Sequence, residues 1–361
     1  MKAAVLREIN KPLSIEDVAI DNPAPHEVLV RTVAAGVCHS DLHFQNGSYQ
    51  YPMPAVLGHE SAGVVEKVGS EVHYVKPGDH VITCLSVFCG HCDYCTKGRP
   101  ALCSGKSETQ RQPGAKPRLS KDGAPVWQFL DLSSYAEQML VHENAIVKID
   151  REMPLDRAAL IGCGVMTGAG AVMNTARIPA GSTVAVLGCG GVGLAAIQGA
   201  RIAGASRIIA VDTVASKLEL AKRMGATDGV NAKTGDPVEQ VKQLTGGGVE
   251  FSFEAIGLKK TAEQAFEMLR NGGTATVIGM IPVGTKIELH GVDFLFEKRI
   301  QGSSMGSNAF RVDMPRFVEL YKQGRLNLDD LISKRIGLGD VNAAFEDLKK
   351  GEVARSVILF S

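Results

Sequence analysis

Four cysteines lie within the segment "FCGHCDYCTKGRPALC", which spans 88–103. They are Cys89, Cys92, Cys95 and Cys103. Thiols at this density and spacing are typical of a tetrathiolate zinc site, in which cysteines separated by two residues bind the same ion. A disulfide pair or an iron–sulfur cluster is an alternative use of such thiols. Because four thiolates complete the tetrahedron and leave no position for a substrate, a zinc ion held here would be structural.

A metal ion that takes part in a reaction needs an open coordination position, and three other stretches offer ligands for one. Cys38 lies in "GVCHSDLH" (36–43), His59 in "GHES" (58–61) and Cys163 in "GCGVMTGAGA" (162–171). One histidine and two cysteines form the mixed ligand set of a catalytic dehydrogenase zinc. The three residues are far apart in sequence, so spacing alone does not join them. Buried structural cysteine and histidine side chains are the alternative.

The segment "GCGGVG" (188–193) fits the pattern G-x-G-x-x-G with Gly188, Gly190 and Gly193. It follows an apolar strand pattern, opens a helical one, and precedes Asp212 at the end of the next strand pattern, which is the context of a dinucleotide-binding loop. Asp212 would accept hydrogen bonds from the adenosine ribose and repel a 2′-phosphate. No arginine follows it, so NAD is favoured over NADP. A glycine-rich turn without a ligand is the alternative.

The elements that must position these residues fall into two patterns. The first 150 residues contain short β-branched runs bounded by glycine and proline, such as 62–69 and 78–84. From about 181, expected strands at 183–188, 207–212, 249–257 and 274–279 alternate with expected helices at 192–205, 216–226 and 261–273. This alternation predicts a parallel, doubly wound sheet. A helix at 340–351 and a strand at 356–360 close the chain.

Composition excludes several classes of partner. The 361 residues include 39 basic and 39 acidic side chains, so no net charge favours nucleic acid or an acidic membrane. The N-terminus carries no signal-peptide pattern, which predicts a cytoplasmic protein with reduced thiols. The apolar window 183–205 could be a transmembrane helix, but Gln198 and Arg201 interrupt it. We therefore expect no membrane partner and, from the chain length, two domains.

Six motifs occur in an order that identifies a family. They are "GVCHSDLH", "GHESAGVVEKVG", the four-cysteine segment, "GCGVMTGAGA", "GCGGVG" and the terminal "ARSVIL". Over essentially its full length the chain resembles the zinc-dependent alcohol dehydrogenases of the medium-chain dehydrogenase/reductase superfamily. The resemblance implies an α/β fold, with a mostly-β GroES-like catalytic domain at 1–164 and 308–361 and an inserted Rossmann NAD-binding domain at 165–307.

The resemblance also assigns roles to residues of this sequence. Catalytic zinc would be held by Cys38, His59 and Cys163, and structural zinc by Cys89, Cys92, Cys95 and Cys103. Glu60 matches a carboxylate that aids ligand exchange at the metal, and Asp41 an acid that orients the histidine ligand. Ser40 would hydrogen-bond the substrate oxygen, and His43 would form the surface end of a proton relay. The coenzyme site would comprise His39, Gly188, Gly190, Gly193, Asp212, Lys217 and Arg355.

The implied reaction is the oxidation of primary or secondary alcohols to aldehydes or ketones, and the reverse reduction, with NAD(H) and two zinc ions per chain. Hydride would leave a zinc-bound alkoxide. For individual residues, Ser40 could instead cap a helix and His43 could be an exposed loop histidine. A non-catalytic NAD sensor is a further reading of the chain, but all three catalytic zinc ligands are present, which disfavours it.

The substrate is less defined. Pocket positions implied by the resemblance are Tyr49, Leu85, Phe129, Leu130 and Val283, which favour an apolar alcohol, and ordinary core packing is the alternative for each. A glutathione-dependent formaldehyde dehydrogenase is the second reading within the family, although 44–58 contains no acidic residue. The basic segment 106–121 could bind an anion, but a solvated loop is the simpler interpretation. A homodimer or homotetramer is expected, with the edge strand around 298–305 as the dimer contact.

Overall fold

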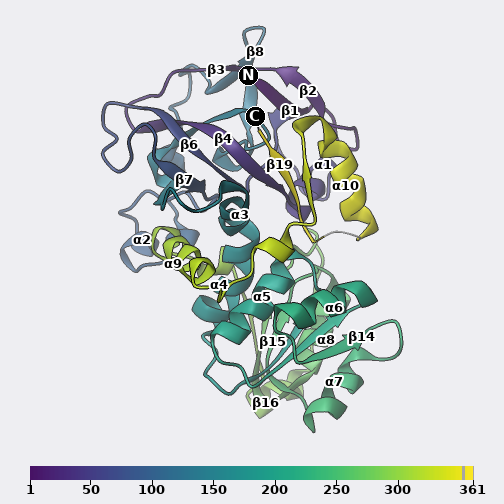
Figure 1. The fold of residues 1–361 in the computed structure, drawn as a ribbon. Helices are drawn as coiled ribbons and strands as arrows, with labels where there is room; N and C mark the ends of the chain where they lie inside the picture. The colour runs from purple at the N-terminus through teal and green to yellow at the C-terminus, as the bar shows by residue number, and fades with distance from the viewer. Residues whose placement is uncertain (352–353, 361) are drawn as a thin grey trace. The chain divides into compact units, whose positions relative to one another are not determined.

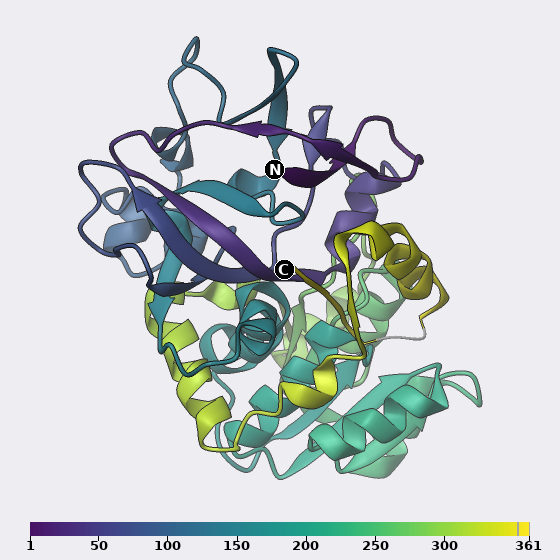
Figure 2. The ribbon, with the colours of Figure 1, turned by 45° about the horizontal axis from the view of Figure 1, so that its top comes forward.

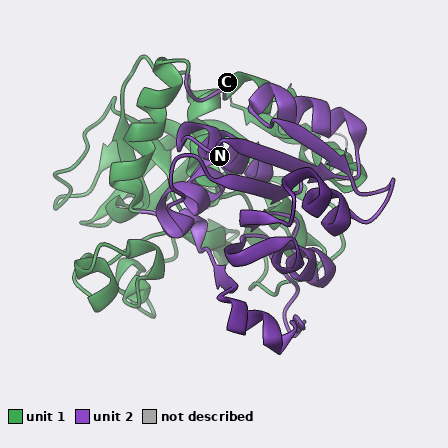
Figure 3. Cartoon of the chain, turned by 90° about the horizontal axis from the view of Figure 1, so that it is seen from below, with its two compact units in different colours: residues 1–163, 309–324, 328–361 green, residues 164–308, 325–327 purple. Residues whose placement is uncertain are grey.

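The computed structural model describes residues 1–351 and 354–360, and the chain divides into two compact units (Figures 1 and 3). The first unit comprises residues 1–163, 309–324 and 328–361, and the second comprises 164–308 and 325–327. The second unit is therefore an insertion in the chain of the first. Its limits differ from the expected 165–307 by one residue at each end, and residues 325–327 join it in addition.

Two sheets form most of the first unit. One has the strand order β2-β1-β5-β9-β8-β3, and the other the order β11-β7-β6-β4-β19-β18 with β10 also paired to β4. The strands are β1 (Lys2–Leu6), β2 (Ser14–Asp17), β3 (Ala19–Ile20), β4 (Glu27–Val37), β5 (Ala55–Val56), β6 (Ser61–Val68), β7 (His80–Thr83), β8 (Leu119–Lys121), β9 (Ala124–Gln128), β10 (Gln138–His142), β11 (Ile146–Ile149), β18 (Lys334–Ile336) and β19 (Ser356–Leu359). The mostly-β character expected for this part of the chain is confirmed.

Strand β4 is the centre of the second of these sheets. It pairs with β6, β10 and β19, and nearly all of its eleven residues are buried, as its run of valines and alanines requires. Strand β19 runs antiparallel beside it, with Ser356 opposite Val37 (Figure 2). This pairing brings the C-terminal segment next to Cys38, which directly follows β4.

The first unit has five α-helices, counted over its described residues. They are α1 (His39–Gln45), α2 (Asp93–Thr96), α3 (Leu155–Leu160), α9 (Phe310–Lys322) and α10 (Val341–Lys350). Helix α10 buries Val341, Ala344, Phe345 and Leu348 at helical spacing, and these residues join the apolar core formed with Leu42, Leu57 and Tyr135. That core lies directly behind helix α1.

The second unit is built on one parallel sheet with the order β14-β13-β12-β15-β16-β17. Numbered within the unit this is 3-2-1-4-5-6, the order of a doubly wound dinucleotide-binding fold. Its strands are β12 (Thr183–Leu187), β13 (Arg207–Asp212), β14 (Asp228–Asn231), β15 (Val249–Glu254), β16 (Leu269–Val277) and β17 (Arg299–Gly302). The strand order reverses between β12 and β15, so the loop after β12 lies at the switch point where ligands bind in such folds.

The helices of this unit are α4 (Met166–Gly170), α5 (Gly191–Ile202), α6 (Ala215–Met224), α7 (Pro237–Thr245) and α8 (Lys259–Glu267). The helix expected at 261–273 is wrong in its second half, because α8 ends at Glu267 and Leu269 begins β16. Leu269 continues the helical spacing of the buried Ala262, Ala265 and Phe266, yet it pairs with Val249 in the parallel sheet. Pairing with a neighbouring strand outweighs local periodicity at this position.

One continuous helical stretch, Leu155–Ala176, is long and apolar enough by length and composition to cross a membrane, and 78% of its most apolar window is buried within the protein. A buried core helix of this length has the same composition. The window 183–205, in which the sequence allowed a transmembrane helix, instead forms strand β12, the glycine loop and helix α5. That alternative is wrong.

Candidate active site

Helix α1 carries several of the expected site residues because of how it begins. Cys38 is its N-cap in extended conformation, and Asp41 at the third helical position accepts a hydrogen bond from the Cys38 backbone N–H at 3.3 Å. Cys38 Sγ lies 3.7 Å from the hydroxyl of Ser40. The cap of this helix is therefore Cys38, and the alternative in which Ser40 caps the helix is wrong. Ser40 is free to face the sulfur instead.

The Asp41 carboxylate orients His59. Its Oδ1 lies 3.0 Å from His59 Nδ1 and accepts from the Gly58 N–H at 3.1 Å, while its Oδ2 accepts from the Tyr135 hydroxyl at 2.7 Å. Asp41, His59 and Tyr135 are all fully buried. Burial lowers the pKa of His59, but the negative charges of Asp41 and Cys38 outweigh it and raise that pKa above its ordinary value. With Nδ1 on Asp41, the buried Nε2 is left without a hydrogen-bond partner.

Cys163 reaches the same place from a different part of the chain. It lies in a π-helical turn, Ile161–Val165, that continues α3. Such turns frequently occur at functional sites because they redirect a side chain within a helix. The preceding Gly162 is needed for this approach, since a Cβ there would lie 2.9 Å from the carbonyl oxygen of Thr83. A hydrogen bond with Cys163 is the main cause that lowers the pKa of Cys38 well below its ordinary value.

Cys38, His59 and Cys163 thus form one group, whose ligand atoms lie within 4.8 Å of one another and are all buried. Two sulfurs and one imidazole nitrogen are the donor set of a catalytic zinc with a fourth position open. The unpartnered Nε2 of His59 fits this function, because a buried ring nitrogen without a partner is unfavourable unless a metal ion binds it. The residues present therefore fit a zinc ion.

Glu60 and Arg355 form a buried ion pair beside this group. Arg355 Nε lies 3.2 Å from Glu60 Oε1, and the two side chains are 5% and 0% exposed. Gly36 leaves room for the carboxylate, since a Cβ there would lie 2.1 Å from Glu60 Oε1. Nearby Glu60 and Cys38 outweigh burial and raise the pKa of Arg355 above its ordinary value. Arg355 thus compensates negative charge around the metal ligands; its expected contact with a pyrophosphate stays a prediction.

His43 lies in helix α1 and is half-buried, so the alternative of an exposed loop histidine is wrong. Its ring centroid lies 5.2 Å from that of His39 and 6.1 Å from that of Tyr49. Burial and the neighbouring His39 lower the pKa of His43 from its ordinary value. A neutral imidazole in this position can accept a proton and pass it on.

The four-cysteine segment closes on a second group. The Sγ–Sγ distances are 3.5 Å for Cys92–Cys95, 3.8 Å for Cys92–Cys103 and 3.6 Å for Cys89–Cys103. A tetrahedron with Zn–S bonds of about 2.3 Å has edges of about 3.8 Å, so one ion fits between these sulfurs. All eight cysteines of the chain lie in the described residues and are free, so the disulfide alternative is wrong.

The glycine loop of the second unit follows β12 and opens α5. A Cβ at Gly193 would lie 1.7 Å from the carbonyl oxygen of Gly188, whereas one at Gly190 would have nothing within 4 Å. Gly193 therefore allows the close packing of the turn, and Gly190 leaves the open side that a pyrophosphate requires. Asp212 accepts from the backbone N–H groups of Cys189 at 2.7 Å and Val214 at 2.9 Å, which ties β13 to the loop.

Lys217 lies in α6 of the same unit, close enough to Cys189 to lower the pKa of that thiol slightly against a much larger rise caused by burial. These residues fit a dinucleotide in their chemistry and arrangement. Arg355 and His39, the other expected coenzyme residues, belong to the first unit.

The expected pocket residues are only partly brought together. The Phe129 ring is fully buried, with its centroid 6.0 Å from that of His59, and Tyr49 lies beside His43. Leu130 packs against the same core cluster as Phe129. Leu85 instead packs against a different core cluster, built on β4, β6, β7 and β10. Val283 belongs to the second unit and is 80% exposed.

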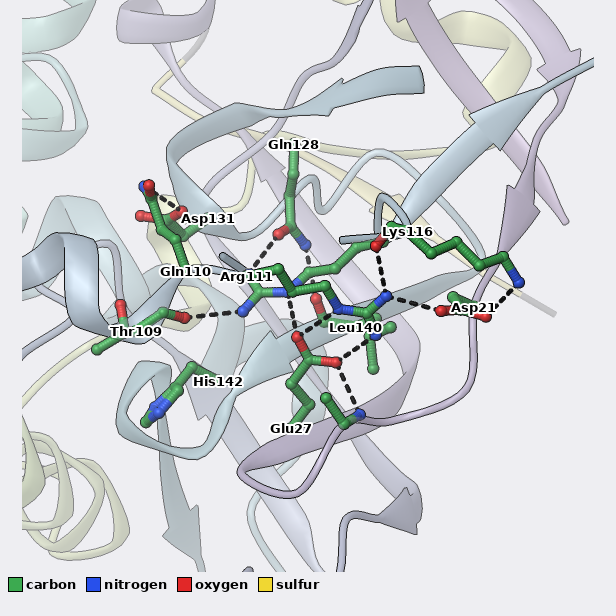
Figure 4. Close-up of polar contacts among 12 residues, drawn as sticks. Asp21, Glu27, Thr109, Gln110, Arg111, Lys116, Gln128, Asp131, Leu140 and His142 are labelled. Atoms are coloured by element: carbon green, nitrogen blue, oxygen red, sulfur yellow. Dashed lines mark hydrogen bonds and ion pairs between the residues drawn. The ribbon is translucent and has the colours of Figure 1, made fainter. Parts of the chain in front are cut away.

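The basic segment 106–121 is not a solvated loop, contrary to expectation. Arg111 contacts Glu27 Oε2 at 2.6 Å and Asp21 Oδ2 at 2.7 Å, and Lys116 contacts Asp21 at 2.5 Å (Figure 4). Arg118 is buried and contacts Glu27 Oε1 at 2.7 Å. These cations are neutralised within the first unit, because turns near 21 and 27 supply the carboxylates.

Two residues with roles in the site carried no signal that sequence reasoning used. Tyr135 holds Asp41 from the opposite side to His59. The hydroxyl of Tyr51 hydrogen-bonds the backbone on both sides of Phe129. Both are tyrosines in segments of ordinary composition, and only the tertiary structure brings their hydroxyl groups to these partners.

Comparisons with known proteins agree with this geometry. Residues 24–151 match the family described as an alcohol dehydrogenase GroES-like domain, and residues 191–323 match that described as a zinc-binding dehydrogenase. The chain is 39% identical to an alcohol dehydrogenase class-3 of Oryza sativa subsp. japonica over 99% of this chain and 96% of that protein. It is equally 39% identical to an S-(hydroxymethyl)glutathione dehydrogenase of Saccharomyces cerevisiae, over 99% and 95%.

Solved structures agree as well. A benzyl alcohol dehydrogenase from Acinetobacter calcoaceticus superposes with a TM-score of 0.94 at 36% identity, covering 100% of this chain and 99% of that one. The chain belongs to the zinc-dependent alcohol dehydrogenases of the medium-chain dehydrogenase/reductase superfamily. It is accordingly an oxidoreductase, and the expected combination of a GroES-like domain with a Rossmann-like domain is confirmed.

Proposed function

We propose that this chain oxidises primary or secondary alcohols to aldehydes or ketones, and reduces them in reverse, with NAD(H) as coenzyme. The observation that carries the proposal is the buried group of Cys38, His59 and Cys163, in which His59 Nε2 has no partner. When bound, zinc would act there as a Lewis acid toward the alcohol oxygen and NAD would accept the hydride. The first unit is assigned the catalytic role and the second the coenzyme role.

The chain's own residues account for the proton and the coenzyme preference. Ser40, next to Cys38 Sγ, is placed to hydrogen-bond a substrate hydroxyl, and His43 one helical turn further on can receive its proton. Asp212 at the end of β13 favours NAD, because a 2′-phosphate would meet its negative charge. Cys89, Cys92, Cys95 and Cys103 are assigned to a second, structural zinc, which has no open position.

The glutathione-dependent oxidation of formaldehyde is a second candidate, since the class-3 and S-(hydroxymethyl)glutathione dehydrogenases are 39% identical to this chain. Recognition of a glutathione adduct requires charged groups that are available to a ligand. Arg111 and Arg118 are committed to Glu27 and Asp21, which argues against their use for an anion. We therefore favour glutathione-independent turnover of apolar alcohols, in a cytoplasmic protein with no nucleic acid or membrane partner.

We also propose that the chain assembles through strand β17, the edge of the parallel sheet. Paired on one side to β16, it has no second neighbour among the described residues. The preceding turn Gly291–Phe296 exposes Val292, Phe294, Leu295 and Phe296, with Leu295 at 81%. An unpaired strand edge beside exposed apolar side chains is the surface that a second copy covers in a dimer or tetramer.

The reaction is tested by the absorbance of NADH. Purified protein is given NAD with a panel of alcohols, and formaldehyde with and without glutathione, before and after removal of zinc. We expect zinc-dependent turnover of apolar alcohols without glutathione. Activity restricted to formaldehyde plus glutathione would establish the second candidate instead.

A further inference from the structure

The Tyr51 hydroxyl bridges the backbone on both sides of Phe129. It donates to the carbonyl oxygen of Gln128 at 2.8 Å and accepts from the N–H of Leu130 at 3.2 Å. The three rings of Tyr51, Phe129 and Phe44 meet edge to face, with centroid separations of 5.1 Å for Tyr51–Phe129 and 4.7 Å for Phe44–Phe129. Removal of one hydroxyl would leave two backbone groups of the same turn without their partner.

This turn has an unusual backbone. Leu130, Asp131 and Ser133 have positive φ of 50°, 63° and 61°. Side chains other than glycine seldom adopt this conformation, and it persists only where surrounding contacts hold it. Ser133 contributes, because its Oγ accepts from the Phe129 N–H at 2.9 Å and donates to the carbonyl oxygen of Val56 at 2.8 Å. Backbone strain of this kind concentrates at functional sites.

A polar chain anchors the start of the turn. The Gln128 amide donates to the carbonyl oxygens of Leu132 at 3.2 Å and Leu140 at 2.8 Å, and its Oε1 accepts from Arg118 at 2.9 Å (Figure 4). Arg118 in turn contacts Glu27. The ion-paired segment that the sequence presented as basic and solvated therefore holds the residue next to Phe129.

The turn lies against a zinc ligand. The Phe129 ring meets the His59 ring edge to face at a centroid distance of 6.0 Å, and both rings are fully buried. Contacts of this kind depend on ring position, so a shift of the turn moves the aromatic surface beside the metal site.

We propose that Tyr51 is a positioning residue whose hydroxyl fixes the Phe129–Leu130 turn beside His59, and that this turn makes the enzyme select aromatic alcohols over short aliphatic ones. The inference rests on the proposed alcohol dehydrogenase function and adds its substrate class. An aromatic alcohol gains from a fixed ring surface, whereas ethanol is too small to contact it extensively.

The test compares wild type with Tyr51→Phe, which keeps the ring and removes only the hydroxyl. Tyr321→Phe is the matched control, because it removes a hydroxyl that hydrogen-bonds the exposed Asp329. The first readout is hydrogen exchange of the peptide that contains the Leu130 amide. The second is kcat/KM for benzyl alcohol and for ethanol, with zinc content and the unfolding midpoint recorded for each variant.

We expect Tyr51→Phe to exchange the Leu130 amide faster than wild type, since its acceptor is gone. The ratio of kcat/KM for benzyl alcohol to that for ethanol should fall about tenfold, mainly through KM for benzyl alcohol. Zinc content should not change, and Tyr321→Phe should match wild type in both readouts. Unchanged exchange at Leu130, or faster exchange with an unchanged substrate ratio, would overturn the proposal.

Failure of the proposed function is recognised separately. If wild-type protein oxidises no alcohol at all, that function is wrong, and selectivity is read from binding of benzyl alcohol and ethanol to the zinc-loaded protein by saturation-transfer NMR. A preference for benzyl alcohol that Tyr51→Phe removes would support the role of Tyr51. The same preference in both proteins, or none in wild type, would contradict it.

Discussion

The Oδ1 atom of Asp41 lies 3.0 Å from Nδ1 of His59, and both side chains are completely buried. This contact decides which nitrogen of His59 faces Cys38 and Cys163. Metal-binding histidines commonly donate their second N–H to a carboxylate, which fixes the ring and strengthens the metal bond. Asp41 is itself held by Tyr135 and by the backbone of Gly58, so the orientation is determined by a network and not by one pair.

Asp41→Asn should weaken zinc binding at this group about 10- to 100-fold, because a neutral amide supports the histidine less well than a carboxylate. Zinc affinity is measured by competition with a chromophoric chelator. Asp93→Asn is a suitable control, since Asp93 is an exposed acid next to the four-cysteine group. Equal loss of zinc in both variants would mean that Asp41 has no specific effect.

Replacement of ligands should separate the two metal groups. Cys38→Ala should abolish turnover and reduce zinc from two ions to one per chain, whereas Cys103→Ala should chiefly lower the unfolding temperature, since a closed tetrathiolate site contributes to folding. Metal content, melting temperature and turnover are measured on the same preparations. A folded Cys103→Ala protein that binds NADH yet has no turnover would contradict the assignment of the two roles.

The glycine loop offers a paired test of coenzyme binding. Gly190→Ala should fold normally, because a Cβ there meets nothing within 4 Å, but should weaken NADH binding by occupying the side open to a pyrophosphate. Gly229→Ala is the control on the same sheet, since its Cβ would make an ordinary contact at 3.6 Å. Affinity is read from NADH fluorescence. Equal affinities in the two variants would exclude this loop as the pyrophosphate site.

Acid should destabilise the protein through His142. Burial, followed by the charge of Arg118, lowers the pKa of His142 to about 4 in the folded state. The unfolded chain binds that proton below about pH 6.5, so between these values it holds more protons than the folded state and stability falls as the pH falls.

His142→Asn should reduce this slope, because its amide oxygen can still accept from the Asn144 N–H that contacts His142 Nδ1. Urea unfolding at several pH values between 4 and 7 provides the measurement. The exposed His73→Asn is the control and should keep the wild-type slope. A slope that is the same in all three proteins would rule out His142 as its source.

The oligomer is expected to depend on the apolar turn beside β17. Leu295→Asp places a charge on a side chain that is 81% exposed, so the monomer should fold while association is lost. Light scattering after size exclusion gives the mass, and Val312→Asp, on a 50% exposed residue of the first unit, is the control. An unchanged oligomer in Leu295→Asp would place the contact elsewhere.

The sequence alone was sufficient for the features that depend on short-range chemistry. The spacing of Cys89, Cys92, Cys95 and Cys103, and the glycine pattern after an apolar strand, each describe one local structure. The structure brings those four sulfurs together and opens a helix after the glycine loop, as the patterns indicate. The ligands Cys38, His59 and Cys163 were joined only through the family resemblance, because periodicity and spacing carry no information across such separations.

Only the tertiary structure decided what depends on partners distant in sequence. Local periodicity continued α8 through Leu269, but pairing with Val249 makes that residue part of a strand. Charge counting made the segment around Arg118 look solvated, whereas Glu27 neutralises it from 91 residues away. Tyr51 reaches the Phe129 turn and Tyr135 reaches Asp41 in the same way. Hydrogen bonds and ion pairs act over a few ångströms, so such roles exist only once folding has brought the chain segments together.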